Sequence, residues 1–126
     1  MDKNDIKQKA KETAEKIARL LADKQNTNII TIDVSEKSNV TDYFVLSTAK
    51  SQTNAKTVCE YIQETLEAEG IFATRIEGEK VGNWIVMDYT TVIVHIFHES
   101  EREMYKLERL WVEPDESNVT RYMGVK

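Results

Sequence analysis

Two histidines and a glutamate in the C-terminal third of the chain are the residues whose types come nearest to a metal site. His95 and His98 lie three positions apart, and Glu99 follows directly. Residues at this spacing along a strand point to opposite faces, so their donor atoms should not converge on one ion. A zinc site also needs three or four ligands. We therefore expect no metal and no cofactor, and His95 is interpreted as a partly buried strand residue with one hydrogen-bond partner.

Cys59 and three aspartates are the other candidates for catalysis. Cys59 is the only cysteine, and it falls on the apolar stripe of a predicted helix, where a thiol packs as a small hydrophobic group. Asp33, Asp42 and Asp88 fall at predicted strand ends or turns, where aspartate commonly bonds the local backbone. The chain has no GxxxxGKS or GxxxxGKT phosphate loop, no GxGxxG turn and no GxSxG elbow. The sequence gives no support to an enzyme.

A block of large aromatic and charged residues near the C-terminus is the most prominent feature. Tyrosine, tryptophan and arginine are the residue types that anchor protein–protein interfaces. The block contains Trp84, Asp88, His95, Phe97, Arg102, Tyr105 and Trp111. Two interpretations remain open: the block forms an interface, or the two tryptophans fill the core between the sheet and the last helix.

Composition and charge limit the classes of protein. The 126 residues have a net charge of −5, and residues 99–116 carry seven acids against three bases. An acidic balance disfavours nucleic acid as the main partner and favours a basic protein. No segment approaches the roughly 20 apolar residues of a membrane span, and the N-terminus is too polar for a secretory signal. We expect one soluble, acidic, cytoplasmic domain with no membrane contact.

The first half of the chain predicts two amphipathic helices around two strands. Apolar residues recur every three or four positions from Ile6 to Leu21, which indicates a helix. Residues 29–34 form a β-branched run, and the nearly all-apolar segment 42–47 is typical of a strand buried on both faces. A second apolar stripe predicts a helix capped by Ser51 and stopped by Gly70.

The second half predicts three strands and one helix. Residues 71–76 indicate a strand, and 84–87 and 92–97 indicate two more joined by a tight turn. Ser100 and Glu103 have the form of a capping box opening a helix that carries Met104, Leu107, Leu110 and Trp111. The order α-β-β-α-β-β-β-α predicts an α/β (α+β mixed) fold, with a mixed sheet of about five strands flanked by helices.

Several motifs together resemble the ribosomal silencing factors, also called Iojap-like proteins. These are Thr41-Asp42-Tyr43-Phe44-Val45, Glu77-Gly78, Trp84-Ile85-Val86-Met87-Asp88, Val92-Ile93-Val94-His95-Ile96-Phe97 and the segment from Arg102 to Trp111. The resemblance covers roughly residues 5 to 112. It implies a nucleotidyltransferase-like fold without the catalytic residues, and this chain lacks the Gly-Ser turn and D-x-D strand of those enzymes.

The resemblance also implies a function and a partner. The family binds the large ribosomal subunit, chiefly through ribosomal protein L-fourteen, with little direct RNA contact. A bound factor prevents the small subunit from joining and represses translation under nutrient limitation, and it is linked to large-subunit biogenesis. Candidate contacts on this chain are Trp84, Asp88, His95, Phe97, Glu101, Arg102, Tyr105, Glu108 and Trp111.

Some alternatives remain open from the sequence. The resemblance predicts one domain over residues 1–112 and a C-terminal extension, 113–126, which is either disordered or adds an edge strand at Asn118 to Tyr122. A nucleotidyltransferase-like enzyme that binds a nucleotide is the alternative function. A homodimer that uses the aromatic block as its own interface is a third interpretation, because symmetric dimers are common.

Overall fold

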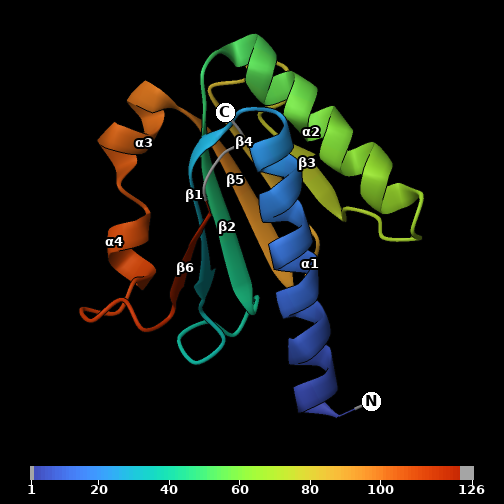
Figure 1. Cartoon of the computed structure of the whole chain (residues 1–126), viewed down its shortest axis with the longest axis vertical. Helices are drawn as coiled ribbons and strands as arrows, with labels where there is room; N and C mark the ends of the chain where they lie inside the picture. The colour runs from blue at the N-terminus through green and yellow to red at the C-terminus, as the bar shows by residue number, and fades with distance from the viewer. Residues whose placement is uncertain (1, 123–126) are drawn as a thin grey trace.

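The chain folds into a six-stranded sheet with long helices on one side and a shorter C-terminal segment on the other (Figure 1). The computed structural model describes residues 2–122, except the side chains of Met104 and Tyr105. The elements in chain order are α1 (Lys3–Asp23), β1 (Thr27–Asp33), β2 (Tyr43–Ala49), α2 (Gln52–Glu67), β3 (Arg75–Glu77), β4 (Trp84–Asp88), β5 (Val92–His98), α3 (Glu99–Tyr105), α4 (Glu108–Trp111) and β6 (Val119–Tyr122).

The strands lie in the order β3-β4-β5-β2-β1-β6. β2 and β5 are parallel neighbours, and every other neighbouring pair is antiparallel. The predicted mixed sheet is therefore confirmed, with six strands in place of about five. All residues of β2 are buried, as its unbroken apolar pattern predicted. The strand predicted at 71–76 is mostly irregular, because regular pairing with β4 begins only at Arg75.

Two long helices cover one face of the sheet, which we call the helix face. In α1 the predicted stripe is buried through Ala10, Ala14, Ile17 and Leu21. In α2 the buried stripe runs from Ala55 to Leu66. The Ser51 side chain caps α2 by accepting a hydrogen bond of 2.9 Å from the Asn54 amide, as predicted. Periodic apolar residues pack both helices on the sheet.

A buried asparagine joins these helices to the sheet. Asn26 has no exposed surface, and its Oδ1 accepts a hydrogen bond from Ser47 Oγ at 2.9 Å. Its Nδ2 donates to Asn54 Oδ1 at 3.1 Å, while Asn54 Nδ2 donates to the Lys24 carbonyl. These bonds satisfy polar groups that would otherwise be costly to bury. They fix the turn in which β2 leads into α2.

The opposite face, which we call the aromatic face, is covered by two short helices instead of one. A single helix opening at Ser100 was predicted, but α3 begins at Glu99 with His98 as its N-cap. Lys106 then adopts a left-handed conformation, with φ of 46°, and separates α3 from α4. This break turns the chain so that Leu107 and Trp111 both pack on the sheet. It also leaves Leu110, one of the apolar residues of the predicted helix, 72% exposed.

The C-terminal extension adds an edge strand. β6 pairs antiparallel with β1, with Ile29 opposite Tyr122 and Ile32 opposite Val119. Of the two alternatives for this extension, the structure contains the strand over Val119–Tyr122, while residues 123–126 lie outside the described chain. No helix in the part of the chain described here has the length and apolar character that crossing a bilayer requires.

Candidate partner-binding face

The aromatic face is built by alternation along three neighbouring strands. On β4 and β5, the residues Ile85, Met87, Val94 and Ile96 point to the helix face and belong to its core. Their neighbours therefore point the other way. The side chains on the aromatic face include Trp84, Val86 and Asp88 of β4, Ile93, His95 and Phe97 of β5, and Phe44 and Leu46 of β2.

The centre of this face is a cluster of four rings. Trp84 lies directly opposite Phe97 across the β4–β5 ladder, and their ring centres are 5.0 Å apart. His95 stacks on Phe97 at 5.9 Å, and Phe44 meets the edge of His95 at 5.4 Å. Such cross-strand aromatic contacts stabilise a sheet and hold each ring in one orientation.

His95 is held neutral in this cluster. Trp84 Nε1 donates a hydrogen bond of 3.1 Å to His95 Nδ1, so the ring proton belongs on Nε2. Burial lowers the pKa of His95 to about 4, because the charged imidazolium would lose its hydration. The sequence expectation of a partly buried strand histidine with a hydrogen-bond partner is confirmed.

Trp111 closes the cluster from the C-terminal segment. Its ring meets Phe44 edge to face at 5.1 Å. Leu107, Val112 and Val119 also pack against the apolar residues of this face. Trp84 and Trp111 remain partly exposed, whereas Phe97 is fully buried and His95 is 8% exposed. The two tryptophans therefore present ring surface at the sides of a buried centre.

Arg102 ties α3 to the sheet. Its Nη1 donates to the Asn28 carbonyl and, at 3.0 Å, to Thr48 Oγ1. Its Nε lies 3.6 Å from Glu108 Oε1. Burial lowers the pKa of Arg102, and the Glu108 carboxylate opposes this effect. The other carboxylate oxygen of Glu108, Oε2, is buried without a partner. A charge reversal at Glu108 would therefore disturb Arg102.

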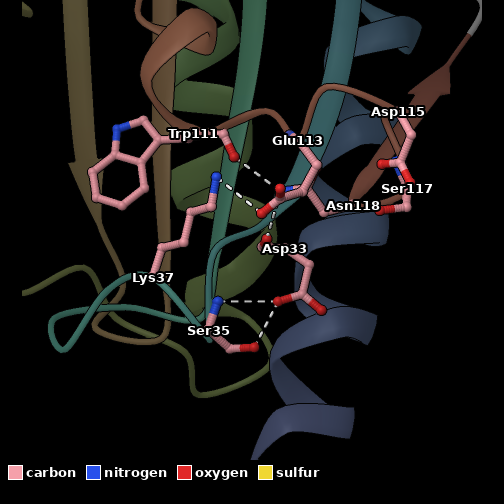
Figure 2. A network of polar contacts seen from close by, with 8 residues as sticks. All are labelled: Asp33, Ser35, Lys37, Trp111, Glu113, Asp115, Ser117 and Asn118. Carbon is pink, nitrogen blue, oxygen red and sulfur yellow. Dashed lines mark hydrogen bonds and ion pairs between the residues drawn. The ribbon is translucent and has the colours of Figure 1, made fainter.

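Asn118 holds the end of the same segment (Figure 2). Its Nδ2 donates to the Trp111 carbonyl at 2.9 Å and to the Asp33 carbonyl at 3.0 Å. Its Oδ1 accepts from the Glu113 amide at 2.9 Å. Lys37 Nζ also forms an ion pair of 2.9 Å with Glu113 Oε1 beside this contact. One side chain thus fixes the backbone on both sides of the loop that follows Trp111.

Asp33 lies beside this loop and remains a carboxylate. Burial alone would raise its pKa, but hydrogen bonds from Ser35 and the nearby Lys7 outweigh burial and lower the pKa. Ser35 Oγ donates to Asp33 Oδ1 at 2.6 Å, and Lys7 Nζ lies 3.1 Å from Oδ2. Asp33 therefore acts as a local anchor for the β1 end, as its position at a strand end predicted.

The remaining candidates have different surroundings. Asp88 ends β4, and its Oδ1 accepts from the Thr90 amide at 2.8 Å inside the β4–β5 turn. Glu101 is partly exposed on α3. Tyr105 is the last residue of α3, but its side chain lies outside the described part of the structure. The structure thus gathers Trp84, His95, Phe97 and Trp111, while Arg102 and Glu108 pair with each other.

Sequence reasoning missed residues that shape this face. Val86 and Ile93 are partly exposed apolar side chains beside the ring cluster, and Leu110 is exposed next to Trp111. Side chains alternate between the two faces along β4 and β5, and this alternation could have placed Val86 and Ile93 on the aromatic face. No local signal marked Asn118, because its partner on β1 is 85 positions away.

The residues first examined for chemistry lie apart from one another. Cys59 is buried in the helix-face core, as predicted, and burial raises its pKa to about 11. His98 accepts from the Ser100 amide at the start of α3, whereas His95 belongs to the ring cluster. Among residues 2–122, no three histidine, cysteine, aspartate or glutamate side chains form a group that could hold a metal ion.

Comparison with known proteins agrees with this architecture. The family model described as "Ribosomal silencing factor during starvation" matches residues 7–125. The ribosomal silencing factor RsfS of Bacillus subtilis is 33% identical over 89 residues, which are 71% of this chain and 75% of that protein. The mouse protein named "Mitochondrial assembly of ribosomal large subunit protein 1" is 27% identical over 105 residues, covering 81% of this chain and 46% of the mouse protein.

A solved structure shares the fold. A crystal structure of a protein from Bacillus halodurans superimposes with a TM-score of 0.70 at 26% sequence identity. The superposition covers 82% of this chain and 94% of that one. The agreement extends over nearly the whole of the compared protein, so the arrangement of sheet and helices is common to both.

Proposed function

Since this chain belongs to the ribosomal silencing factor family, we propose that it binds ribosomal protein L-fourteen on the large subunit and keeps the small subunit from joining. The family comprises ribosome-associated translation regulators that are not enzymes. Binding to the large subunit would then repress translation under nutrient limitation. In this proposal the chain acts in the cytoplasm, where the subunits join, and it needs no cofactor.

The observation that supports this proposal most strongly is the partial exposure of apolar residues on the aromatic face. Trp84 and Trp111 expose part of their rings around a buried centre, and Leu110 extends the apolar surface. Interfaces are anchored by such rings packed in a rigid setting, surrounded by residues that exclude water. The rigidity comes from the Arg102 and Asn118 contacts, which leave little side-chain and loop ordering to occur on binding.

The charge distribution supports a basic protein as the partner. The whole chain carries −5, and residues 99–116, which include α3 and α4, contribute a net −4. Opposite charges around an apolar centre raise the association rate and reject wrong partners. Nearby RNA phosphate would repel the same segment, which favours contact through protein over contact through RNA.

A steric block needs no chemistry. The factor has only to occupy the space that the small subunit requires, with enough affinity to compete. A standard interface of about 800 Å² per partner suffices for stable binding. The mouse relative's name refers to assembly of the large subunit. A factor held on an immature subunit would act there by the same contact, so we propose a role in biogenesis through the same face.

A subunit-joining assay tests the proposal. Purified large and small subunits are mixed with and without the chain and separated on a sucrose gradient. We expect the chain to comigrate with the large subunit and complete ribosomes to decrease. If the chain stays at the top of the gradient while subunits join normally, the proposed function is wrong.

Variants locate the contact. Trp111→Ala should weaken large-subunit binding at least about tenfold, since a central aromatic anchor contributes about 2 kcal/mol or more. Leu110→Glu should also weaken it, and because Leu110 is 72% exposed, the fold should be unaffected. The matched control is Ile6→Glu on α1, where Ile6 is 43% exposed on the other side of the sheet. Equal binding by all three variants would place the contact elsewhere.

Light scattering on dilution tests the homodimer. A dimer that dissociates when L-fourteen is added, and that Leu110→Glu disrupts, would use the same aromatic face. A dimer insensitive to both would use another surface. A monomer at all concentrations would remove this interpretation.

A further inference from the structure

A groove of about 550 Å³ opens at the carboxyl ends of the two parallel strands β2 and β5. Its walls come from four parts of the chain. They are the start of β1 with the residues before it, the end of β2 with Lys50, the α3–α4 segment, and β6. A hollow of this size is within the range that holds a small molecule.

The topology at this groove is the one that creates ligand sites in open sheets. After β2 the chain passes into α2, on the helix face, and after β5 it passes into α3, on the aromatic face (Figure 1). The two neighbouring parallel strands therefore send their connections to opposite sides of the sheet. Ligands bind outside the carboxyl ends of strands at such a point, because the diverging connections leave a crevice.

Five cationic side chains line the groove: Lys50, Arg102, Lys106, Arg109 and Arg121. They come from the β2–α2 turn, α3, the α3–α4 turn, α4 and β6, so the fold brings them together from distant positions. This gathering of positive charge is unusual on a chain with a net charge of −5.

Three carboxylates line the same groove, and they leave cations in excess. Glu108 pairs with Arg102, and Glu103 lies 3.9 Å from Lys106. Glu99 is exposed in the first turn of α3. Five cations against three acids give the lining a net +2, and Arg121 is also paired with Glu116 outside the lining. Among the described residues, Lys50 and Arg109 are therefore the lining cations without a carboxylate partner. Arg102 is already oriented by Thr48, so part of the groove is formed in advance.

We propose that this groove binds a small molecule carrying two or more phosphate groups, of the size of a nucleotide. Phosphate suits a set of arginines and lysines arranged around a crevice, because guanidinium groups bind its oxygens in pairs. Lys50 lies in the β2–α2 turn, which the bonds of Asn26 and Asn54 hold in place. The site has no catalytic role in this proposal.

A small ligand fits better than a polynucleotide. The cations are confined to one hollow, whereas RNA-binding surfaces extend over a basic stripe that follows the backbone. Outside the lining, the segment 99–116 adds four acids and no base, and these would repel a longer phosphate chain. The ligand is therefore a compact polyphosphate.

Calorimetric titration of the free full-length chain tests the proposal independently of the ribosome. The probes are inorganic pyrophosphate, ATP and adenosine, at low salt. We expect ATP and pyrophosphate to bind with a dissociation constant below about 1 mM and adenosine not to bind, because phosphate carries the recognition. On adding ATP, the NMR signals of the backbone amides should shift for Thr27, Lys50 and Arg109. The amide signals of residues at the centre of the aromatic face, such as Phe44 and His95, should not shift.

Variants of the exposed cations give the decisive comparison. Arg109→Gln combined with Lys106→Asn should weaken ATP binding about tenfold or more, and asparagine tolerates the left-handed backbone at that position. Arg109→Gln alone, at an exposed position, is the variant whose folding is not in question. Arg19→Gln, an exposed arginine on α1, is the matched control and should change binding less than about twofold.

Three results would overturn the proposal. One is no binding of ATP or pyrophosphate at about 10 mM. Another is equal weakening by Arg19→Gln, which would mean diffuse attraction to the surface. The third is tighter binding of a short single-stranded RNA that is lost with the same two substitutions, which would identify a polynucleotide as the occupant.

Discussion

The two faces of the sheet differ in how much they bury and in how they are covered, because most of the buried apolar residues belong to the helix face. On the helix face, helices of 21 and 16 residues present continuous buried stripes. On the aromatic face, the cover consists of helices of seven and four residues joined by a left-handed turn. Regular apolar packing holds the first cover, whereas the second combines a smaller apolar contact with individual polar contacts from Arg102 and Asn118.

The cover of the helix face mainly stabilises the fold, whereas the cover of the aromatic face lies where we propose that a partner binds. A cover held by many apolar contacts opens only when the whole domain unfolds, whereas one held by a few polar contacts can open locally. The aromatic face has the second kind of cover and also the exposed tryptophan surface. A partner that binds there would therefore depend on the few polar contacts, from Arg102 and Asn118, that keep this cover closed.

The largest expected effect is on the helix face. Leu66→Ala removes a fully buried side chain of α2 and leaves a cavity, so the free energy of unfolding should fall by about 2–5 kcal/mol. Leu110→Ala, the same change at a residue that is 72% exposed, should cost less than about 0.5 kcal/mol. Chemical denaturation measures both. Similar losses at the two positions would contradict the assignment of the main core to the helix face.

Acid should destabilise the aromatic face specifically through His95. Its folded pKa of about 4 lies below the ordinary value of about 6.5, so the unfolded chain binds the proton more readily. The contribution of His95 leaves the free energy of unfolding unchanged above pH 6.5. This free energy falls as the pH drops from 6.5 to 4, and about 3 kcal/mol has been lost near pH 4. Since carboxylates titrate in the same window, the measurement is the difference between the unfolding free energies of wild type and His95→Phe. A pH-independent difference would mean that the pKa of His95 is the same in the folded and unfolded chain.

The cover of the helix face could be predicted from the sequence because its signals are local. The stripes of α1 and α2 repeat every three or four residues, and Ser51 caps α2 three residues before its partner Asn54. The parallel pairing of β2 with β5 was not predicted, although a mixed sheet was. Elements that are determined by residues close together in the sequence can therefore be predicted from it.

The cover of the aromatic face could not be predicted as well, because its causes are distant in sequence. Arg102 bonds residues 54 and 74 positions away, and these contacts fix α3 before the break at Lys106. The capping box at Ser100 and the apolar residues from Met104 to Trp111 therefore indicated one helix where two are formed. The aromatic residue types correctly indicated a cluster, but the pairing of Arg102 with Glu108 depends on that same break.

Removing the Asn118 contacts should loosen the aromatic cover with a moderate effect. Asn118→Ala leaves the Trp111 and Asp33 carbonyls without this donor, so local opening should become easier by about 1–3 kcal/mol. Hydrogen exchange should accelerate at β6 and around Trp111 while the α2 amides stay protected. Asp115→Ala, which removes only the acceptor of the Ser117 amide in the same loop, is the control. Uniform acceleration across both faces would show that the two covers open together.

The smallest expected effect concerns the break itself. Lys106 holds φ of 46°, a conformation that costs side chains with a Cβ about 1 kcal/mol and costs glycine little. Lys106→Gly should therefore stabilise the chain by about 0.5–1 kcal/mol, even though it removes the exposed pair with Glu103, which contributes little. Lys106→Ala removes the same side chain without relieving the backbone, so only glycine should raise the denaturation midpoint. If both substitutions lowered it equally, the lysine side chain, and not the turn, would be holding α3 and α4 apart, and the aromatic cover would depend on surface contacts after all.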